Sequence, residues 1–230
     1  MTPGFYKDQE KLHVSVDCII LGFKNDKLYL LLIKRKFEPL KGQESLMGGF
    51  IRSNENLTDA VSRTVYEYTG ITDMFMEQIG AYGDIGRDIG ERVISIAYYA
   101  LINIESYDEE LSKIHNTRWV ELEEVGDLIF DHKKILDDTI TMLRKQAISQ
   151  PIGLNLLPEK FTLPQLHSLY EAIYQKTLDK RNLRKKIAEM DILEKLDEKD
   201  KSSSKKGAYY YRFNKDKYNQ LMERGYYISL

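Results

Sequence analysis

The 230-residue sequence is poor in cysteine, tryptophan and proline, with one, one and five residues of these types. The single cysteine, Cys18, excludes an internal disulfide and suits a reducing compartment. It stands in an apolar run, where we expect a small buried side chain rather than a nucleophile. The sequence therefore predicts a fold without an internal disulfide.

Long apolar runs are also missing. The longest, from Val14 to Phe23, is interrupted by Asp17 and is too short to cross a bilayer. The opening stretch MTPGFYKDQEKLH carries scattered charges and no apolar core of a signal peptide. No repeat of solenoid length is present. We therefore expect a soluble protein in the cytoplasm.

Charge is distributed unevenly along the chain. The net charge of −2 divides into −7 for residues 1–150 and +5 for residues 151–230. Two halves of opposite sign indicate two tasks in one chain, with the basic half facing an anionic partner.

The first half predicts a layered α/β domain over residues 1–150. Residues 14–23 and 28–34 are rich in β-forming side chains, and Lys24-Asn25-Asp26-Lys27 between them has turn chemistry, which predicts a hairpin. Apolar residues then recur at helical spacing, and Pro151 and Gly153 end the last helix. The other elements expected are helices over 56–68, closed by Gly70, and over about 131–147, and strands over 93–102 and 117–122.

The second half, residues 151–230, predicts two helices followed by a hairpin. Thr162 is suited to cap a first helix that has Pro164 in its first turn, and Thr177 to cap a second that runs to Met190. Strands over 192–195 and 207–213 flank a turn rich in serine and lysine. A last helix covers 216–224 and is closed by Gly225. This order is typical of a winged helix-turn-helix domain.

From Gly49 the sequence reads GFIRSNENLTDAVSRTVYEYTGI, which resembles the Nudix signature. The resemblance extends over nearly all of residues 10–147 and implies a Nudix-type α/β/α sandwich with a mixed sheet. The positions that match, all in register, are Gly49, Glu55, Arg63, Val65, Glu67, Gly70 and Ile71.

The departures from the signature concern its chemistry. The family's reaction needs three carboxylates at i, i+3 and i+4 on one helical face, where they hold divalent cations against a diphosphate. Here these positions are Thr64, Glu67 and Tyr68. We therefore predict no hydrolase activity, no metal and no cofactor. The alternative role for Glu67 is structural, in an ion-pair ladder with Asp59 and Arg63.

A pocket without its catalyst can bind without cutting. A nucleotide diphosphate needs clustered arginine and lysine, so the −7 charge of this half favours a sugar. His132 is the sharpest candidate, although a histidine at a helix start serves equally as a cap or a packed side chain. The candidates at positions corresponding to the Nudix substrate cleft are Asp17, Lys34, Arg52, Asp84, Arg87, Asp131 and His132.

The second helix of the C-terminal half has a basic face, and the hairpin after it carries lysines and tyrosines. Arginine and asparagine read base edges in the major groove, and lysines contact phosphates. The alternative is a solvated basic helix in a module that binds protein. The candidate DNA contacts are Lys180, Arg181, Asn182, Arg184, Lys185, Lys186, Lys205, Lys206, Tyr209 and Arg212.

Together the two halves resemble Nudix-related bacterial transcriptional regulators, in which a winged helix follows a Nudix domain. The resemblance implies a homodimer on a palindromic double-stranded DNA operator, with a metabolite changing the placement of the two winged helices. We expect a repressor of sugar utilisation that responds to L-arabinose. The alternatives are an ADP-ribose-responsive regulator of NAD metabolism, an active Nudix hydrolase with an accessory domain, and a protein-binding module.

Overall fold

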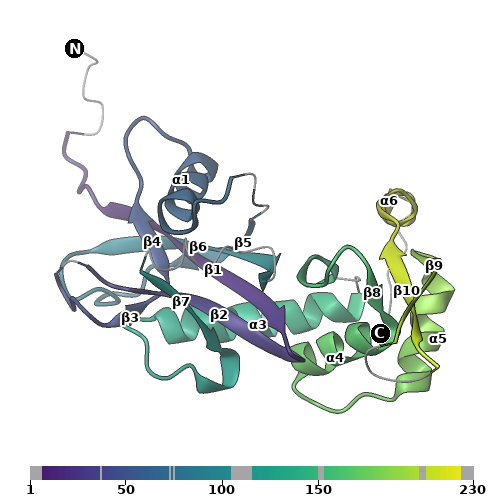
Figure 1. Cartoon of the computed structure of the whole chain (residues 1–230). Helices are drawn as coiled ribbons and strands as arrows, with labels where there is room; N and C mark the ends of the chain where they lie inside the picture. Colours follow the sequence, from purple (N-terminus) through teal and green to yellow (C-terminus); the bar gives the residue numbers. More distant parts are fainter. Residues whose placement is uncertain are drawn as a thin grey trace.

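The computed structural model describes residues 7–36, 38–72, 74, 76–104, 116–149, 153–201 and 206–223. Its ribbon has a large sheet between two helices and a smaller helical part with a three-stranded sheet (Figure 1). Within these residues, no helix is both long enough and apolar enough to cross a membrane.

The large sheet has seven strands in the order β3-β2-β1-β6-β5, with β4 paired to β1 and β7 to β2. It is mixed, because β1 runs parallel to β6 and antiparallel to β2 and β4. Its elements are β1 (His13–Lys24), β2 (Lys27–Lys34), β3 (Glu44–Ser45), β4 (Met47–Phe50), α1 (Leu57–Thr69), β5 (Glu77–Tyr82), β6 (Val93–Asn103), β7 (Thr117–Glu121), η2 (Leu122–Glu124) and α3 (His132–Ser149).

Side chains alternate across the sheet, and this alternation makes the sandwich. Along β1, Cys18 and Ile20 belong to the core under α1, whereas Ile19 and Leu21 belong to the core that includes α3. Both faces are apolar, so β1 appears in the sequence as a continuous apolar run and not as an alternating strand. The predicted Nudix-type α/β/α sandwich is confirmed.

The predicted local signals of this half are present. Asn25 and Asp26 take positive φ angles of 49° and 63°, as a tight hairpin turn between β1 and β2 requires. Helix α1 begins after Asn56, whose backbone N–H donates to the Asp59 carboxylate at 3.1 Å. It ends at Gly70, which is left-handed with a φ of 69°.

The C-terminal part is a winged helix. Its small sheet has the order β8-β10-β9, and α4 and α5 precede the two long strands of the wing. Thr162 caps α4 as predicted, with its hydroxyl accepting from the backbone N–H of Gln165 at 3.3 Å. The elements are η3 (Leu154–Leu156), β8 (Phe161–Thr162), α4 (Leu163–Tyr174), α5 (Lys180–Met190), β9 (Leu193–Asp200), β10 (Ala208–Phe213) and α6 (Lys215–Glu223).

Two boundaries of the winged helix differ from the prediction. Helix α5 is capped by Asp179 and not by Thr177: the Asp179 carboxylate accepts from the backbone N–H of Asn182 at 2.7 Å. Thr177 and Leu178 instead belong to the turn between the helices. Strand β9 continues to Asp200, beyond the predicted end, because pairing with β10 extends the hairpin. Gly225 lies outside the described residues.

The winged helix packs against the α3 side of the large sheet. Apolar residues of α3, η3 and α4 form one continuous core with the sheet. Arg144 on α3 donates from Nε to the carbonyl of Ile173 at 2.9 Å, and its Nη2 donates to the Gln175 side chain. The carboxyl end of α4 is therefore tied to α3, which lies beside it in Figure 1.

Candidate functional site

A cavity of about 70 Å³ opens between the glycine edge of β4, the end of α1 and the start of α3. Four of the seven predicted effector residues contribute to its surroundings, three of them as direct lining. The lining residues are Ser15, Asp17, Ile33, Arg35, Ser45, Leu46, Gly48, Gly49, Phe50, Tyr68, Arg87, Asp88, Val93, Phe130 and His132.

A buried ion network forms the floor of this cleft. Arg87 binds Asp131 with two hydrogen bonds, Nε to Oδ2 at 2.9 Å and Nη2 to Oδ1 at 2.7 Å. The same Nη2 donates to Asp17 Oδ2 at 3.3 Å, and the Ser95 hydroxyl donates to that oxygen at 2.6 Å. Burial lowers the pKa of Arg87, but its contacts with Asp131 and Asp17 outweigh burial and raise it. Arg87 is therefore a permanent cation between two carboxylates.

His132 completes the network as a neutral ring. Its Nδ1 accepts from the backbone N–H of Leu46 at 3.2 Å, so the proton of the neutral ring is on Nε2, which lies 3.6 Å from Asp17 Oδ1. Burial lowers the pKa of His132 despite the nearby carboxylates. His132 thus acts as a packed, hydrogen-bonded side chain that positions Asp17.

Asp17 is also fixed by the close approach of β4. A Cβ atom at Gly48 would lie 2.6 Å from the Asp17 carboxylate, so only glycine leaves room for it. The polar groups of this network therefore pair with one another. The network, made of Asp17, Arg87, Asp131 and His132, first serves to hold the start of α3 against the sheet.

Another part of the cavity lining surrounds Arg35, whose Nε donates to the carbonyl of Pro39 at 2.6 Å. The Arg35 guanidinium lies 5.4 Å from the centroid of the Phe130 ring, and Tyr68 lines the same cavity. Burial raises the pKa of the Tyr68 phenol, which stays neutral. A guanidinium beside two aromatic rings suits an anionic group attached to a flat base or ring. Sequence reasoning missed Arg35, although it directly follows the candidate Lys34.

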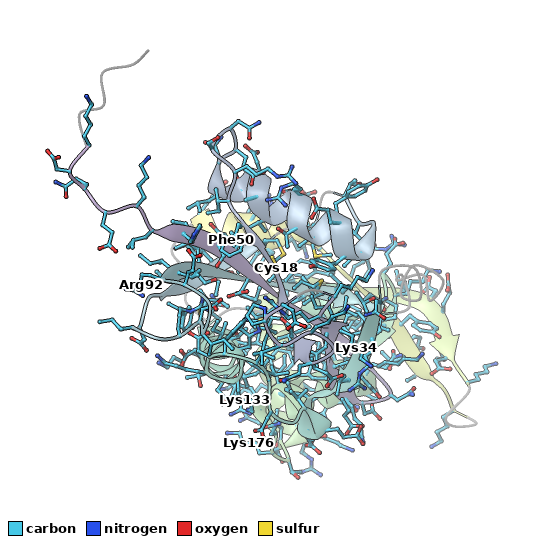
Figure 2. The ribbon with its side chains drawn as sticks, turned by 90° about the vertical axis from the view of Figure 1, so that its left-hand side faces the viewer. Cys18, Lys34, Phe50, Arg92, Lys133 and Lys176 are labelled. Carbon is cyan, nitrogen blue, oxygen red and sulfur yellow. The ribbon has the colours of Figure 1, made fainter. Side chains whose placement is uncertain are left out.

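The other three predicted effector residues lie apart from the network. Lys34 is exposed at the end of β2, and its carbonyl accepts from the Asn116 side chain at 2.9 Å. Asp84 is paired with Lys134 at 3.3 Å on the surface. Arg52 reaches Glu67 at 3.5 Å. Figure 2 shows Lys34 to the right of and below Phe50, which lines the cavity.

The surviving Nudix-box charges lock a loop onto α1. Arg63 binds Glu55 through Nε at 2.9 Å and Nη2 at 2.7 Å, and also donates to the carbonyl of Phe50 at 3.0 Å. The hydrogen bonds from Arg63 lower the pKa of Glu55 to about 2. Arg63 also pairs with Glu67 at 3.4 Å, as the ion-pair prediction requires. Asp59, the third expected member, caps the helix instead.

The three positions of the helical trio do not fit a divalent-cation site. The Thr64 side chain is 1% exposed, has no hydrogen-bond partner among the described residues, and packs beneath Gly49. Tyr68 offers a neutral phenol, and Glu67 is paired with two arginines. Within the part of the chain that the structure describes, no three His, Cys, Asp or Glu side chains gather as a metal site.

The exposed face of α5 is strongly basic. Ile187 and Met190 are buried beneath the helix, which turns the basic side chains outward. Lys185 lies 3.9 Å from Glu189, whereas the other basic side chains of this helix form no ion pair with another described residue. Exposed or half-buried on this face are Lys180, Arg181, Asn182, Arg184, Lys185 and Lys186. Unpaired cations on one face suit a polyanion.

The wing adds cations around one tyrosine. The ammonium groups of Lys195 and Lys199 lie 3.7 Å and 4.3 Å from the centroid of the exposed Tyr209 ring. Lys206 is exposed at the turn, and Lys205 lies outside the described residues. Arg212 is placed differently from the others: it lies 3.4 Å from Glu159 and lines a separate cavity with it. Lys195 and Lys199 were not among the predicted DNA contacts, and Lys199 lies in the part of β9 beyond the predicted end at residue 195.

Two family models match the chain. The model described as NUDIX domain matches residues 11–140, and the model described as NrtR DNA-binding winged helix domain matches residues 153–213. An ADPR responsive transcriptional repressor NtrR from Acinetobacter baylyi is 31% identical over 204 residues, covering 87% of this chain and 81% of that protein. An ADP-ribose pyrophosphatase from Methanocaldococcus jannaschii is 36% identical over 126 residues, covering 54% of this chain and 71% of that protein.

Solved structures share the architecture. Shewanella oneidensis NrtR complexed with a 27mer DNA has a TM-score of 0.82 at 24% identity, covering 94% of this chain and 97% of that one. The NUDIX domain of the same protein complexed with ADP ribose has a TM-score of 0.52 at 26% identity, covering 62% of this chain and 99% of that one. The first of these likenesses establishes the two-part fold.

Proposed function

The chain belongs to the family of Nudix-related NrtR-type transcriptional repressors, and on this premise we propose that ADP-ribose is the effector that controls its binding to DNA. One observation carries the proposal: an ADPR responsive repressor is similar to both parts of this chain, over 87% of the length of this chain. We place the effector domain at residues 1–150 and the DNA-binding domain at residues 151–230.

The choice of effector changes the expectation drawn from the sequence. L-arabinose gains no support from the comparisons, whereas ADP-ribose, the alternative, is named for both the Acinetobacter and Shewanella relatives. The −7 charge of residues 1–150 favoured a sugar, but the summed charge of this half does not describe the charge of the cleft. In the cleft, two arginines (Arg35 and Arg87) balance the charge of two aspartates (Asp17 and Asp88). Arg35 also lies beside the Phe130 ring.

We assign the diphosphate to Arg35 and the adenine or terminal ribose to the Tyr68 and Phe130 side of the cleft. The cavity of about 70 Å³ is smaller than the roughly 300 Å³ expected of a drug-sized ligand. Binding therefore needs the Arg35 and Phe130 side chains to move apart. The Arg87 network, which is buried and fully paired, keeps its hydrogen bonds as the floor and moves together with the start of α3.

The residues at the three helix positions support the proposal of binding without hydrolysis. Thr64 and Tyr68 cannot hold a cation against a diphosphate, and Glu67 alone is a weak ligand. The second candidate function is hydrolysis, and the likeness to a pyrophosphatase over 126 residues favours it. The retained Arg63–Glu55 pair does not itself require hydrolysis, because it shapes the loop before α1.

DNA is the proposed partner of α5 and the wing. Helix α5 enters the major groove with Arg181, Asn182 and Arg184, and the wing lysines near Tyr209 contact the phosphate backbone. A homodimer would place two such helices on a palindromic operator, one turn of DNA apart. Lys206, exposed at the turn, extends the basic wing, and we propose that Lys205 also contacts DNA.

Helix α3 is the proposed connection between effector and DNA. It begins at His132, directly after Asp131 of the cleft network, and carries Arg144 against the carboxyl end of α4. Because α3 is one continuous helix, a shift at its first turn reaches α4, and α4 positions α5. The effector then changes DNA affinity through one rigid element that touches both sites.

Calorimetric titration distinguishes ADP-ribose from L-arabinose as the effector, and recovery of the nucleotide distinguishes binding from hydrolysis. We expect ADP-ribose to bind in EDTA, L-arabinose to give no heat, and ADP-ribose to be recovered intact after incubation with Mg²⁺. Arg35→Ala should weaken binding at least tenfold, while Arg118→Ala, on the surface of β7, serves as the matched control. Release of AMP that Glu67→Gln abolishes would establish the hydrolase instead.

A further inference from the structure

Leu178 lies in the turn between α4 and α5, and both of its backbone polar groups are held by side chains of α4. Its N–H donates to Glu171 Oε1 at 2.9 Å. Its carbonyl oxygen lies 2.9 Å from His167 Nε2. Since the next residue is Asp179, which caps α5, this double contact sets where the basic helix begins.

His167 has an acceptor at each ring nitrogen. Nε2 faces the Leu178 carbonyl, which can only accept, and Nδ1 lies 3.2 Å from Glu171 Oε2. A neutral imidazole has one N–H, so it can serve one of these acceptors and turns a lone pair toward the other. The imidazolium has an N–H on each ring nitrogen and donates to both acceptors. The contacts therefore require one more proton than a neutral histidine beside an ionised glutamate carries.

The pair lies directly under the basic face of α5. His167 is 6% exposed and lines a groove of about 140 Å³ between α4 and α5. Glu171 of α4 lines the same groove, together with Lys180 and Arg184 of α5. Among the described residues, His167, Glu171, Lys180 and Arg184 are the charged or titratable groups that line this groove. The two cations of α5 oppose a positive charge on His167 as long as no anion is bound.

We propose that His167 is a proton-dependent positioning residue for DNA binding. The imidazolium bridges Glu171 and Leu178 and so fixes the start of α5. A DNA phosphate near Lys180 and Arg184 offsets their charge and favours the protonated ring, so binding takes up a proton. DNA affinity then falls as pH rises, because loss of the ring proton leaves one of the two acceptors without a donor. The inference rests on the proposed DNA-binding function.

Fluorescence anisotropy measures the DNA dissociation constant between pH 6 and pH 8.5 at fixed salt. For the full chain we expect Kd to increase with pH, by at most about tenfold per pH unit, the limit for one linked proton. His167→Gln keeps an amide donor for the Leu178 carbonyl but does not titrate, and its Kd should be flat. His13→Gln, on the surface of the Nudix-like domain, should keep the wild-type slope.

Calorimetry of DNA binding in buffers of different ionisation enthalpy independently measures the number of protons that the unmodified chain takes up on binding. Uptake of up to one proton near pH 7 supports the proposal, and zero uptake overturns it even where His167→Gln fails to fold. A His167→Gln variant with the wild-type slope also overturns it. Absence of salt-dependent DNA binding at every pH would instead overturn the proposed function and this inference with it.

Discussion

Replacing Arg87 by leucine tests whether the cleft floor is a structural ion network. The Arg87 side chain is 4% exposed, and its partners Asp17 and Asp131 are 7% and 16% exposed. The substitution removes three charge-assisted hydrogen bonds and leaves two carboxylates facing each other with little access to water. Neither carboxylate has another cationic partner in the network, because His132 is neutral.

The expected loss is large. Removing one partner of a buried ion pair costs about 3–5 kcal/mol, since the remaining charge stays buried without compensation. For a protein of this size, roughly 2–4 °C of melting temperature corresponds to each kcal/mol, so the transition should fall by roughly 10 °C. Urea unfolding followed by the fluorescence of Trp119 measures the free energy of unfolding directly.

Arg118→Leu is the matched control, because its partner Glu44 lies on the surface of the same domain. Exposed ion pairs contribute about 1 kcal/mol or less. Adding Asp131→Asn to Arg87→Leu should recover part of the lost stability, because one uncompensated charge is removed. An Arg87→Leu variant as stable as Arg118→Leu would refute the assignment of Arg87 to the floor and return it to the ligand-binding surface.

Three other variants test separate parts of the structure. Arg144→Gln should leave DNA affinity within about twofold but reduce the effect of ADP-ribose on it, as measured by anisotropy with and without the nucleotide; an undiminished effect would exclude this route. Asp179→Ala should lower the free energy of unfolding by about 1 kcal/mol in urea, through loss of the α5 cap. Arg63 holds the pKa of Glu55 at about 2, below its unfolded value of about 4.3, so this pair stabilises the fold above pH 4.3 and its contribution is lost as pH falls toward 2. Glu55→Gln should therefore show a flatter decline of melting temperature with acid, and an unchanged decline would contradict the pKa shift.

Local patterns in the sequence were sufficient for most of the fold. The β1–β2 turn follows from Asn25 and Asp26, which tolerate positive φ, and the end of α1 follows from Gly70. The start of α5 could not be predicted in the same way. Thr177 and Asp179 are both good caps, and the choice between them depends on Glu171, which holds the Leu178 N–H from seven residues away. Such contacts form only when the two segments meet in the tertiary structure, so a local pattern in the sequence does not reveal them.

Only part of the cleft was predicted, because the rest also depends on tertiary contacts. Asp17, Arg87, Asp131 and His132 were expected near one another from the resemblance, and the structure brings them together. Their mutual pairing could not be predicted, because it depends on distances across three elements. Arg35 was missed because a summed charge over 150 residues hides a single cation beside aromatic rings.

The central claim is that ADP-ribose, bound and not hydrolysed, controls DNA affinity. Anisotropy titration of the full chain against the DNA upstream of its own gene, with and without ADP-ribose in EDTA, tests it most directly. We predict salt-dependent binding whose Kd changes at least about fivefold with ADP-ribose, the lower range of allosteric coupling, and does not change with L-arabinose. An identical Kd with and without ADP-ribose, at concentrations where calorimetry detects its binding, would contradict the account.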